Sequence, residues 1–238
     1  MEETLASRLD GIRNRIAVAC RRAGRAPDSV RLLPVSKMHG PDEIEDAVRA
    51  GLDTFGESRV QEARQKIPLC SGGLHWHFIG HLQTNKVREA VSLFEMLHAV
   101  DSVRLLEFVD RLAAEEGRNL PVCLEVNVSG ERSKYGLRPE ELGGVFEAAG
   151  RLHRVQIVGL MTVPPIAEDP AESRPFFRQL RELRDEWSPR AGLPLPELSM
   201  GMSHDFEPAI EEGSTWVRVG TLLFGPRRRL ENHEPDAP

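Results

Sequence analysis

The stretch Val30-Arg-Leu-Leu-Pro-Val-Ser-Lys-Met-His39 decides how the rest of the chain is organised. It is an apolar run between two segments with helical patterns, and such a run is typical of a strand buried on both faces, as in a parallel sheet. The run leads directly into a lysine, Lys37. Open α/β sheets and (β/α)₈ barrels place their chemistry at the carboxyl ends of parallel strands, so we expect Lys37 at a functional edge.

A lysine at such a position has two interpretations. In a partly desolvated pocket it loses its proton more readily, and the neutral amine can attack a carbonyl carbon to form a Schiff base. Alternatively, Lys37 is a solvated loop residue, which is the usual state of a lysine. The remaining sequence has to decide between the two.

Strand-like runs alternate with helical patterns along the whole chain. Including the first, we expect eight strands, within residues 30–37, 53–56, 74–80, 94–100, 121–128, 155–161, 195–201 and 215–220. An additional amphipathic helix, over residues 4–23, precedes them. Because no compositional break marks a linker, the pattern predicts a single (β/α)₈ barrel over residues 1–226, with a doubly wound open sheet as the alternative. Residues 227–238 are predicted to form a disordered tail.

Composition limits the class of protein. The 238-residue chain has a net charge of -6, which argues against nucleic acid as its main partner. Its three cysteines match neither a disulfide framework nor a metal-binding spacing, which indicates a reducing cytoplasm. The amino terminus has no signal-peptide pattern and no apolar run is long enough to span a membrane. We therefore expect a cytoplasmic protein without a membrane partner, and the ordinary surface composition favours a monomer.

The turns after the last two predicted strands contain small and hydroxylated residues, in Ser199-Met-Gly-Met-Ser203 and in Gly220-Thr221. Barrel enzymes often bind a phosphate after strands seven and eight, where backbone N–H groups and hydroxyls converge. A lysine amine facing a phosphate site indicates pyridoxal 5′-phosphate, held by its phosphate and by an imine to Lys37. The competing interpretation is that these segments are ordinary turns.

Arg218 is an unexpected charge within the last strand, where it is flanked by Val217 and Val219. It forms either an ion pair with a barrel carboxylate such as Glu125 or a contact with the ring nitrogen of the cofactor. In the second case a permanent cation keeps the ring nitrogen unprotonated. The ring is then a weaker electron sink, and strong carbanion chemistry is disfavoured.

Histidines and other polar residues lie in or near the predicted strand ends. His75 and His77 share one face of a strand, and we favour polar filling of the interior over a metal site because no third ligand is identifiable. His39, His81 and His98 are candidates for an acid or a base. The other strand-end positions include Glu57, Ser58, Asn127 and Met161.

Seven segments carry a recognisable pattern in a fixed order: Leu32-Leu-Pro-Val-Ser-Lys37, Phe55–Glu62, Trp76–Gly80 with Leu82–Lys86, Ser133–Gly136, Gly159–Thr162, Leu198–Ser203, and Val217–Thr221 with Phe224-Gly225. In these segments the chain resembles the pyridoxal phosphate homeostasis protein family, over nearly its full length. That family is similar to the N-terminal barrel of alanine racemase, the fold type III of pyridoxal phosphate enzymes. The chain departs from the pattern at Ser58-Arg59, where the family commonly has Asn-Tyr.

The resemblance implies that Lys37 carries pyridoxal 5′-phosphate as a Schiff base and that Arg218 faces the pyridine nitrogen. It also implies that the turns after strands seven and eight hold the phosphate. Members of the family are regarded as binders and suppliers of the cofactor, without established catalysis, that keep free cofactor, vitamin B6 vitamers and some amino-acid pools in balance. For this chain we expect pyridoxal phosphate and B6 vitamers as ligands, with transient contact to pyridoxal phosphate-dependent apo-enzymes. The expected cofactor-binding residues are Lys37, Met161, Ser199, Gly201, Arg218, Gly220 and Thr221.

An amino-acid racemase is the alternative function. Racemisation on this barrel needs two bases on opposite faces of the substrate, and in alanine racemase the second is a tyrosine from a separate domain of a partner chain. This chain has one tyrosine, Tyr135, in a predicted loop, and no room for that domain. We therefore expect binding without a complete proton-transfer pair. A barrel for an unrelated phosphorylated metabolite is a third possibility, which requires that Lys37 form no imine.

Overall fold

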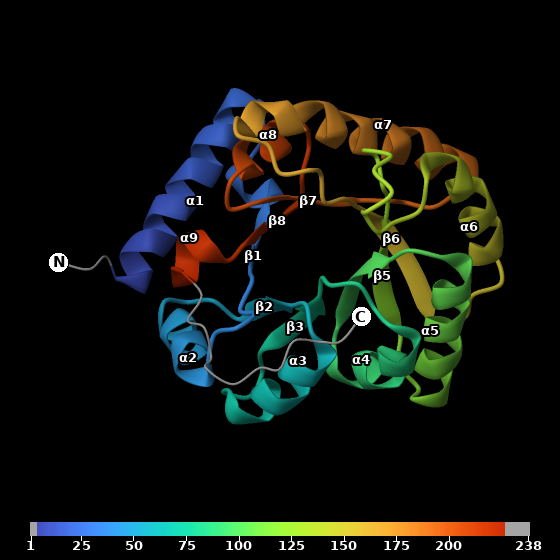
Figure 1. The fold of residues 1–238 in the computed structure, drawn as a ribbon, viewed down its shortest axis with the longest axis horizontal. Helices are drawn as coiled ribbons and strands as arrows, with labels where there is room; N and C mark the ends of the chain where they lie inside the picture. Colours follow the sequence, from blue (N-terminus) through green and yellow to red (C-terminus); the bar gives the residue numbers. More distant parts are fainter. Residues whose placement is uncertain (1–3, 227–238) are drawn as a thin grey trace.

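A computed structural model describes residues 4–226 of the chain, in which eight parallel strands form a ring (Figure 1). The strand order is β1-β8-β7-β6-β5-β4-β3-β2. A bridge between Val35 and Gly56, together with a 3.1 Å hydrogen bond from Ser36 N–H to the Gly56 carbonyl, joins the remaining edges of β1 and β2. The predicted (β/α)₈ barrel is therefore confirmed. The strands are β1 (Arg31–Pro34), β2 (Thr54–Glu57), β3 (His75–Phe78), β4 (Met96–Val100), β5 (Leu120–Glu125), β6 (Val155–Met161), β7 (Glu197–Met202) and β8 (Trp216–Val219).

Helices surround the ring in sequence order, as Figure 1 shows. The α-helices are α1 (Leu5–Arg22), α2 (Pro41–Arg49), α3 (Val60–Lys66), α4 (Val87–Leu93), α5 (Val103–Glu115), α6 (Leu142–Ala149), α7 (Arg174–Ala191), α8 (Phe206–Glu211) and α9 (Thr221–Phe224). Short 3₁₀ helices are η1 (Pro27–Ser29), η2 (Ile67–Leu69), η3 (Thr84–Lys86), η4 (Pro139–Glu141) and η5 (Pro170–Ser173). No helix within residues 4–226 is both long enough and apolar enough to cross a membrane.

The additional helix α1 packs against α8 and α9 on the outside of the barrel (Figure 1). It begins at Thr4, whose hydroxyl accepts a hydrogen bond from Ser7 N–H, as N-cap residues typically do. Arg8 donates to the carbonyl of Leu223 in α9, at 2.6 Å. The apolar side chains of α1 recur at helical spacing and are buried, namely Leu9, Ile12, Ile16, Ala19 and Cys20.

Side chains alternate between the two faces of each strand, which divides the core in two. Along β5, Val122 and Leu124 belong to the large apolar layer between strands and helices, whereas Cys123 lies in a small cluster with Met96 and Met161. This second cluster belongs to the barrel interior, because its members occupy the opposite face of the sheet. Beside this cluster the interior holds polar side chains, among them His77, His98, Ser199 and Arg218, and these lead to the candidate site.

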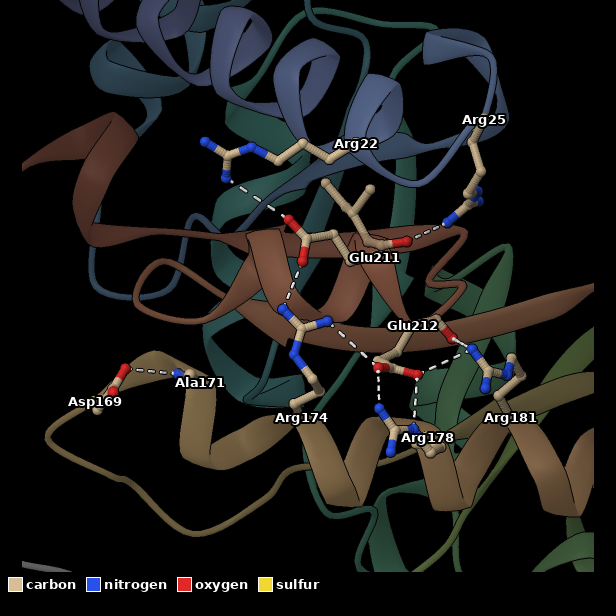
Figure 2. Close-up of polar contacts among 10 residues, drawn as sticks. Arg22, Arg25, Asp169, Ala171, Arg174, Arg178, Arg181, Glu211 and Glu212 are labelled. Atoms are coloured by element: carbon tan, nitrogen blue, oxygen red, sulfur yellow. Dashed lines mark hydrogen bonds and ion pairs between the residues drawn. The ribbon is translucent and has the colours of Figure 1, made fainter.

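A carboxylate at the end of α8 ties the segment between β7 and β8 to α7 (Figure 2). Glu212 accepts hydrogen bonds from Arg178 and Arg181 at 2.9 Å and from Arg174 at 3.3 Å. Burial alone would raise the pKa of Glu212, but the hydrogen bonds from Arg178 and Arg174 outweigh it and hold that pKa below its usual value. Glu211 also pairs with Arg174, so α8 is fixed against α7 by two adjacent carboxylates.

Most strand boundaries differ by a few residues from the predicted ranges, and examples are the fifth strand, the fourth strand and the segment after β8. The fifth strand ends at Glu125 rather than at residue 128, because the chain bends there and Val126 pairs with Leu137 in an isolated bridge. The fourth strand begins at Met96, two residues later than expected. The segment after β8 forms a short helix, α9, that no pattern indicated. The predicted tail, residues 227–238, lies outside the described residues.

Close packing between β6 and β7 makes Gly159 a sensitive position. A Cβ atom there would lie 1.9 Å from the Glu197 carbonyl oxygen, a backbone atom that cannot move independently. Overpacking of this kind should lower the free energy of unfolding of Gly159→Ala by about 3 kcal/mol or more. Gly144→Ala, in helix α6 with nothing within 4 Å, is the control and should stabilise the chain by about 0.5–1 kcal/mol. Chemical denaturation of both variants measures the difference, and equal stabilities would contradict the packing described.

Candidate functional site

Lys37 lies in a turn directly after β1, at the carboxyl-end face of the barrel, and its side chain is half-buried. The sequence has four lysines, and the other three differ in their surroundings. Lys66 is buried and donates three hydrogen bonds. Lys86 lies near Glu89, with 3.9 Å between Nζ and Oε1, and Lys134 belongs to the loop after β5. Lys37 is thus the lysine that the fold brings to the end of a barrel strand, as the sequence predicted.

Arg218 points into the barrel and is 4% exposed. It donates to the Ser199 hydroxyl at 2.8 Å and to the Thr162 carbonyl at 2.9 Å. Burial lowers the pKa of Arg218, whereas Asp205 and Glu125 oppose that change by attraction. Among the described residues neither carboxylate forms an ion pair with Arg218, so the structure does not show the pair with Glu125 that was one of the two alternatives, and the partners of Arg218 are neutral. A guanidinium remains charged here because its intrinsic pKa is so high.

Two buried histidines extend the hydrogen-bond network that runs from Arg218 to Ser199. His98 Nδ1 lies 2.8 Å from the Ser199 hydroxyl, and His98 Nε2 lies 3.1 Å from His77 Nδ1. Burial lowers the pKa of His77 to about 4, with a further contribution from Arg31, and lowers the pKa of His98 well below its usual value. Both rings are therefore neutral at pH 7. His77 fills the interior as expected, whereas the same prediction for His75 is wrong, because His75 is exposed and pairs with Glu95. His98 lies in the middle of β4 with no exposure, so its predicted place near a strand end is wrong.

The ends of β7 and β8 meet in a turn lined by backbone N–H groups. The Ser203 hydroxyl accepts hydrogen bonds from Gly220 N–H at 3.3 Å and from Leu222 N–H at 3.5 Å. A Cβ at residue 220 would lie 3.2 Å from the Val35 carbonyl oxygen, so the turn also packs closely against the end of β1. Thr221 is exposed at the start of α9. Ser203 was not among the predicted binding residues, although the second serine of Ser199-Met-Gly-Met-Ser203 was its visible signal.

Gly201 and Ser199 belong to β7 and lie deeper in the barrel than this turn. Gly201 has φ +90°, and a Cβ there would approach the Ala209 side chain to 2.6 Å and the Phe206 backbone to 2.9 Å. Glycine is thus required so that α8 can pack onto β7. Ser199 is fully buried, and its hydroxyl is engaged by both Arg218 and His98. These two residues shape and support the site from below.

Glu125 and Met161 occupy adjacent strand ends on the other side of the barrel. Met161 belongs to the apolar interior cluster and is 1% exposed. Burial raises the pKa of Glu125 to about 7, with Asp101 adding to the increase and Arg218 opposing it. Glu125 therefore changes its charge near neutral pH, which the sequence did not indicate.

The long loop after β5 folds back on itself beside the barrel. Asn127 donates to the Glu131 carbonyl at 2.9 Å, which closes the loop. The Tyr135 ring stacks on the His81 ring with 3.8 Å between centroids, and His81 pairs with Asp101 at 3.0 Å. Tyr135 is 58% exposed. The ring thus serves as an anchor for the loop.

Two predicted strand-end residues face other surroundings. Glu57 ends β2, but it is completely buried and bonds to Ser36 and to Lys66 of α3 on the helix side of the sheet. His39 stacks on Phe224 with 4.9 Å between ring centroids. Within residues 4–226, no group of three or more His, Cys, Asp or Glu side chains could hold a metal ion.

Comparison with known proteins identifies the class. The family model described as "Alanine racemase, N-terminal domain" matches residues 7–228. Alanine racemase of Clostridium difficile 630 superposes with a TM-score of 0.73 at 14% identity, covering 92% of this chain and 56% of that chain. This likeness shows a shared fold, so the chain is a single barrel of the alanine racemase N-terminal type.

More similar relatives narrow the class to one family. A pyridoxal phosphate homeostasis protein of Aquifex aeolicus (strain VF5) is 46% identical over 222 residues, which are 93% of this chain and 97% of the relative. The protein of that name from Escherichia coli (strain K12) is 38% identical, with 94% and 97% covered. PipY of Synechococcus elongatus PCC7942, solved with PLP bound, is 40% identical with a TM-score of 0.83 and coverage of 93% and 100%. The chain belongs to the pyridoxal phosphate homeostasis protein family.

The raised pKa of Glu125 predicts a pH-dependent penalty. Its pKa is about 7 in the folded chain against an ordinary value of 4.5, so the folded state binds the proton more tightly, and this group lowers stability as the pH rises through 7. Glu125→Gln removes the charge and should raise the free energy of unfolding at pH 8 by about 1–3 kcal/mol, with a smaller gain at pH 5. Denaturation of the cofactor-free protein at both pH values measures this. Glu147→Gln, at an exposed position of α6, should show no such pH difference, and an equal gain in both variants would contradict the assignment.

Proposed function

We propose that this chain binds pyridoxal 5′-phosphate at the carboxyl-end face of the barrel and acts in the intracellular balance and supply of that cofactor. The observation that carries the proposal is the joint presence of Lys37, the buried Arg218 and the backbone-lined turn at Ser203 on strands β1, β8 and β7, which are neighbours in the sheet. The names of the relatives and the PLP-bound PipY structure support it.

The residues present fit the two ends of the cofactor. The amine of Lys37 would replace the aldehyde oxygen, so that a carbon–nitrogen double bond forms and water leaves. Lys66 cannot compete for the aldehyde, because the three donors of its ammonium are already engaged. The phosphate would lie at the turn of Ser203, Gly220 and Thr221, where glycine keeps the backbone accessible.

Arg218 would face the pyridine nitrogen. Two of its nitrogen atoms already donate to Ser199 and Thr162, which fixes the plane of the guanidinium. A guanidinium has only donors, so a ring nitrogen that contacts it must be an acceptor and must stay unprotonated. Pyridoxal phosphate supplies an electron sink for carbanion chemistry when its ring is protonated. We therefore propose that Arg218 suppresses that chemistry, while Met161, Ser199 and Gly201 complete the pocket from below.

We further propose that the chain is a carrier rather than an enzyme. Racemisation needs a second base opposite the lysine, and the two nearby candidates are unsuited to it: Tyr135 is exposed and stacked on His81, and His81 pairs with Asp101. The partners would be pyridoxal phosphate, B6 vitamers and, transiently, cofactor-dependent apo-enzymes. We propose a monomeric, cytoplasmic protein.

Lys37→Ala tests the attachment site. The wild-type protein should take up added pyridoxal phosphate, show an imine absorption band and retain the cofactor covalently after borohydride reduction, because the imine is reduced to a stable amine. The variant should show neither the band nor the reduced adduct. Lys86→Ala, which changes a partly buried lysine of η3 near Glu89, should behave as wild type. A colourless wild-type protein, or an adduct that persists in Lys37→Ala, would overturn the proposal.

Hydrogen exchange at the substrate α-carbon tests the carrier role. Wild-type protein loaded with pyridoxal phosphate is incubated with α-deuterated alanine or serine, and loss of deuterium is followed by NMR. Because no opposed base completes the site, we expect exchange no faster than with free cofactor at the same concentration. Sustained exchange at rates on the order of 1 s⁻¹ or above, as enzymes reach, would establish a racemase-like activity instead.

A further inference from the structure

Both residues next to Lys37 are held by one buried cluster on the helix side of the sheet. The cluster consists of Glu57 at the end of β2 together with Glu62 and Lys66 of α3, and we name it the Lys66 cluster. Lys66 is 6% exposed and Glu57 is not exposed at all. The cluster lies behind the strand ends and contributes no residue to the pocket proposed above.

The ammonium of Lys66 is fully satisfied by this arrangement. It donates to the Ser36 carbonyl at 2.8 Å, to Glu57 Oε1 at 2.8 Å and to Glu62 Oε1 at 2.6 Å. An ammonium has three donors, and all three are used. Each of the two carboxylate oxygens that accept from Lys66 also accepts a second hydrogen bond. Ser36 Oγ donates to Glu57 Oε1, and Met38 N–H donates to Glu62 Oε1, each at 2.6 Å.

The backbone that the cluster holds is a strained turn. His39 N–H donates to the Ser36 carbonyl at 3.0 Å, which makes Ser36–His39 a tight turn with Lys37 at its first corner. The second corner, Met38, has φ +64°, the one positive φ outside glycine within the described residues. Such a turn normally places glycine there, because a side chain at positive φ is unfavourable. A strained conformation persists only where its surroundings impose it.

We propose that the Lys66 cluster positions Lys37 for covalent attachment of the cofactor by imposing this turn on the backbone at Ser36 and Met38. The proposal rests on the proposed function of Lys37. Glu62 is the most direct element, because it holds the Met38 N–H at the strained corner. Lys66 links Glu62 to Glu57 and to the Ser36 carbonyl, so the two sides of Lys37 move together. Burial raises the pKa of Glu57, and the neighbouring Lys66 ammonium opposes that change.

Glu62→Ala is the primary variant, and it removes the acceptor of Met38 N–H without leaving an unpaired buried ammonium, since Lys66 keeps two partners. Asp110→Ala is the matched control for lost stability. Asp110 is a buried carboxylate of α5 that accepts from the N–H groups of His153, Arg154 and Val155, far along the chain from the turn. The double variant Glu62→Ala/Met38→Gly tests rescue, because glycine adopts a positive φ without strain.

Two measurements are made on each protein. An absorption titration gives the dissociation constant for pyridoxal phosphate. NMR of the cofactor-free protein gives the hydrogen-exchange rate of the Met38 amide. We expect Glu62→Ala to raise the dissociation constant about tenfold and to speed Met38 exchange by at least a similar factor, because misplacing a reacting group is costly. Asp110→Ala should lower the melting temperature yet change the dissociation constant by less than about twofold. The double variant should return to within about threefold of wild type.

The outcomes separate the two proposals. If wild type binds and Glu62→Ala binds equally well, or if Asp110→Ala weakens binding as much, the positioning role is overturned while the proposed function stands. Failure of Met38→Gly to restore binding in the Glu62→Ala background also overturns the positioning role, because Glu62 would then affect binding by a route other than the turn. Absence of binding by wild type overturns the proposed function, and unchanged Met38 exchange in Glu62→Ala shows separately that the cluster does not hold the turn.

Discussion

The buried charge of Arg218 is the constraint on which the barrel interior depends. An uncompensated charge in such surroundings costs on the order of several kcal/mol, so the guanidinium requires partners that strands β7 and β6 provide through Ser199 and the Thr162 carbonyl. Ser199 is held in turn by His98, and His98 by His77. Burial keeps both imidazoles neutral, which avoids a second positive charge beside the first. The apolar interior cluster around Met161 is accordingly confined to the opposite side.

The site also depends on how firmly β7 and β8 are held from outside. The turn that carries Ser203 lies between β7 and α8, and α8 approaches β7 so closely that Gly201 has no room for a side chain. Glu212 then fixes the far end of α8 to three arginines of α7 (Figure 2). A structural ion cluster on the surface layer thereby limits the movement of the proposed phosphate turn. The Lys66 cluster has the equivalent position behind β1, so each of the two strand ends that would hold the cofactor has its own support on the helix side.

Sequence periodicity predicted the ring of strands, because parallel strands buried on both faces appear in the sequence as apolar runs separated by helical patterns. The position of Lys37 was predictable for the same reason, since it directly follows the first of these apolar runs. Features that depend on tertiary contacts were not predictable in this way. The end of the fourth strand at Val100 was predicted correctly, but His98 lies two residues before that end and points into the closed barrel interior, where it is fully buried. Glu57 looked like a site residue, but alternation along β2 turns it to the helix side. The raised pKa of Glu125 arises from burial and from Asp101, a residue of another loop, which no local pattern contains. Ser203 was part of the predicted turn segment Ser199–Ser203, but that its hydroxyl joins the β7 and β8 turns depends on a tertiary contact that no local pattern contains.

Two independent features support the proposal of a carrier over an enzyme, and they act at different points of the chemistry. Arg218 would limit how far the cofactor ring can accept electrons, which affects any reaction that passes through a carbanion. The two nearby candidates for a second base are engaged elsewhere, since Tyr135 is stacked on His81 in an exposed loop and His81 is paired with Asp101, which limits where a proton can go. Attachment to Lys37 needs neither property, because it requires only a positioned amine and the loss of water. In the further proposal, the strained turn that the Lys66 cluster holds is what positions that amine. The arrangement of these buried polar groups thus supports the proposal that the chain holds the cofactor rather than catalysing a reaction on it.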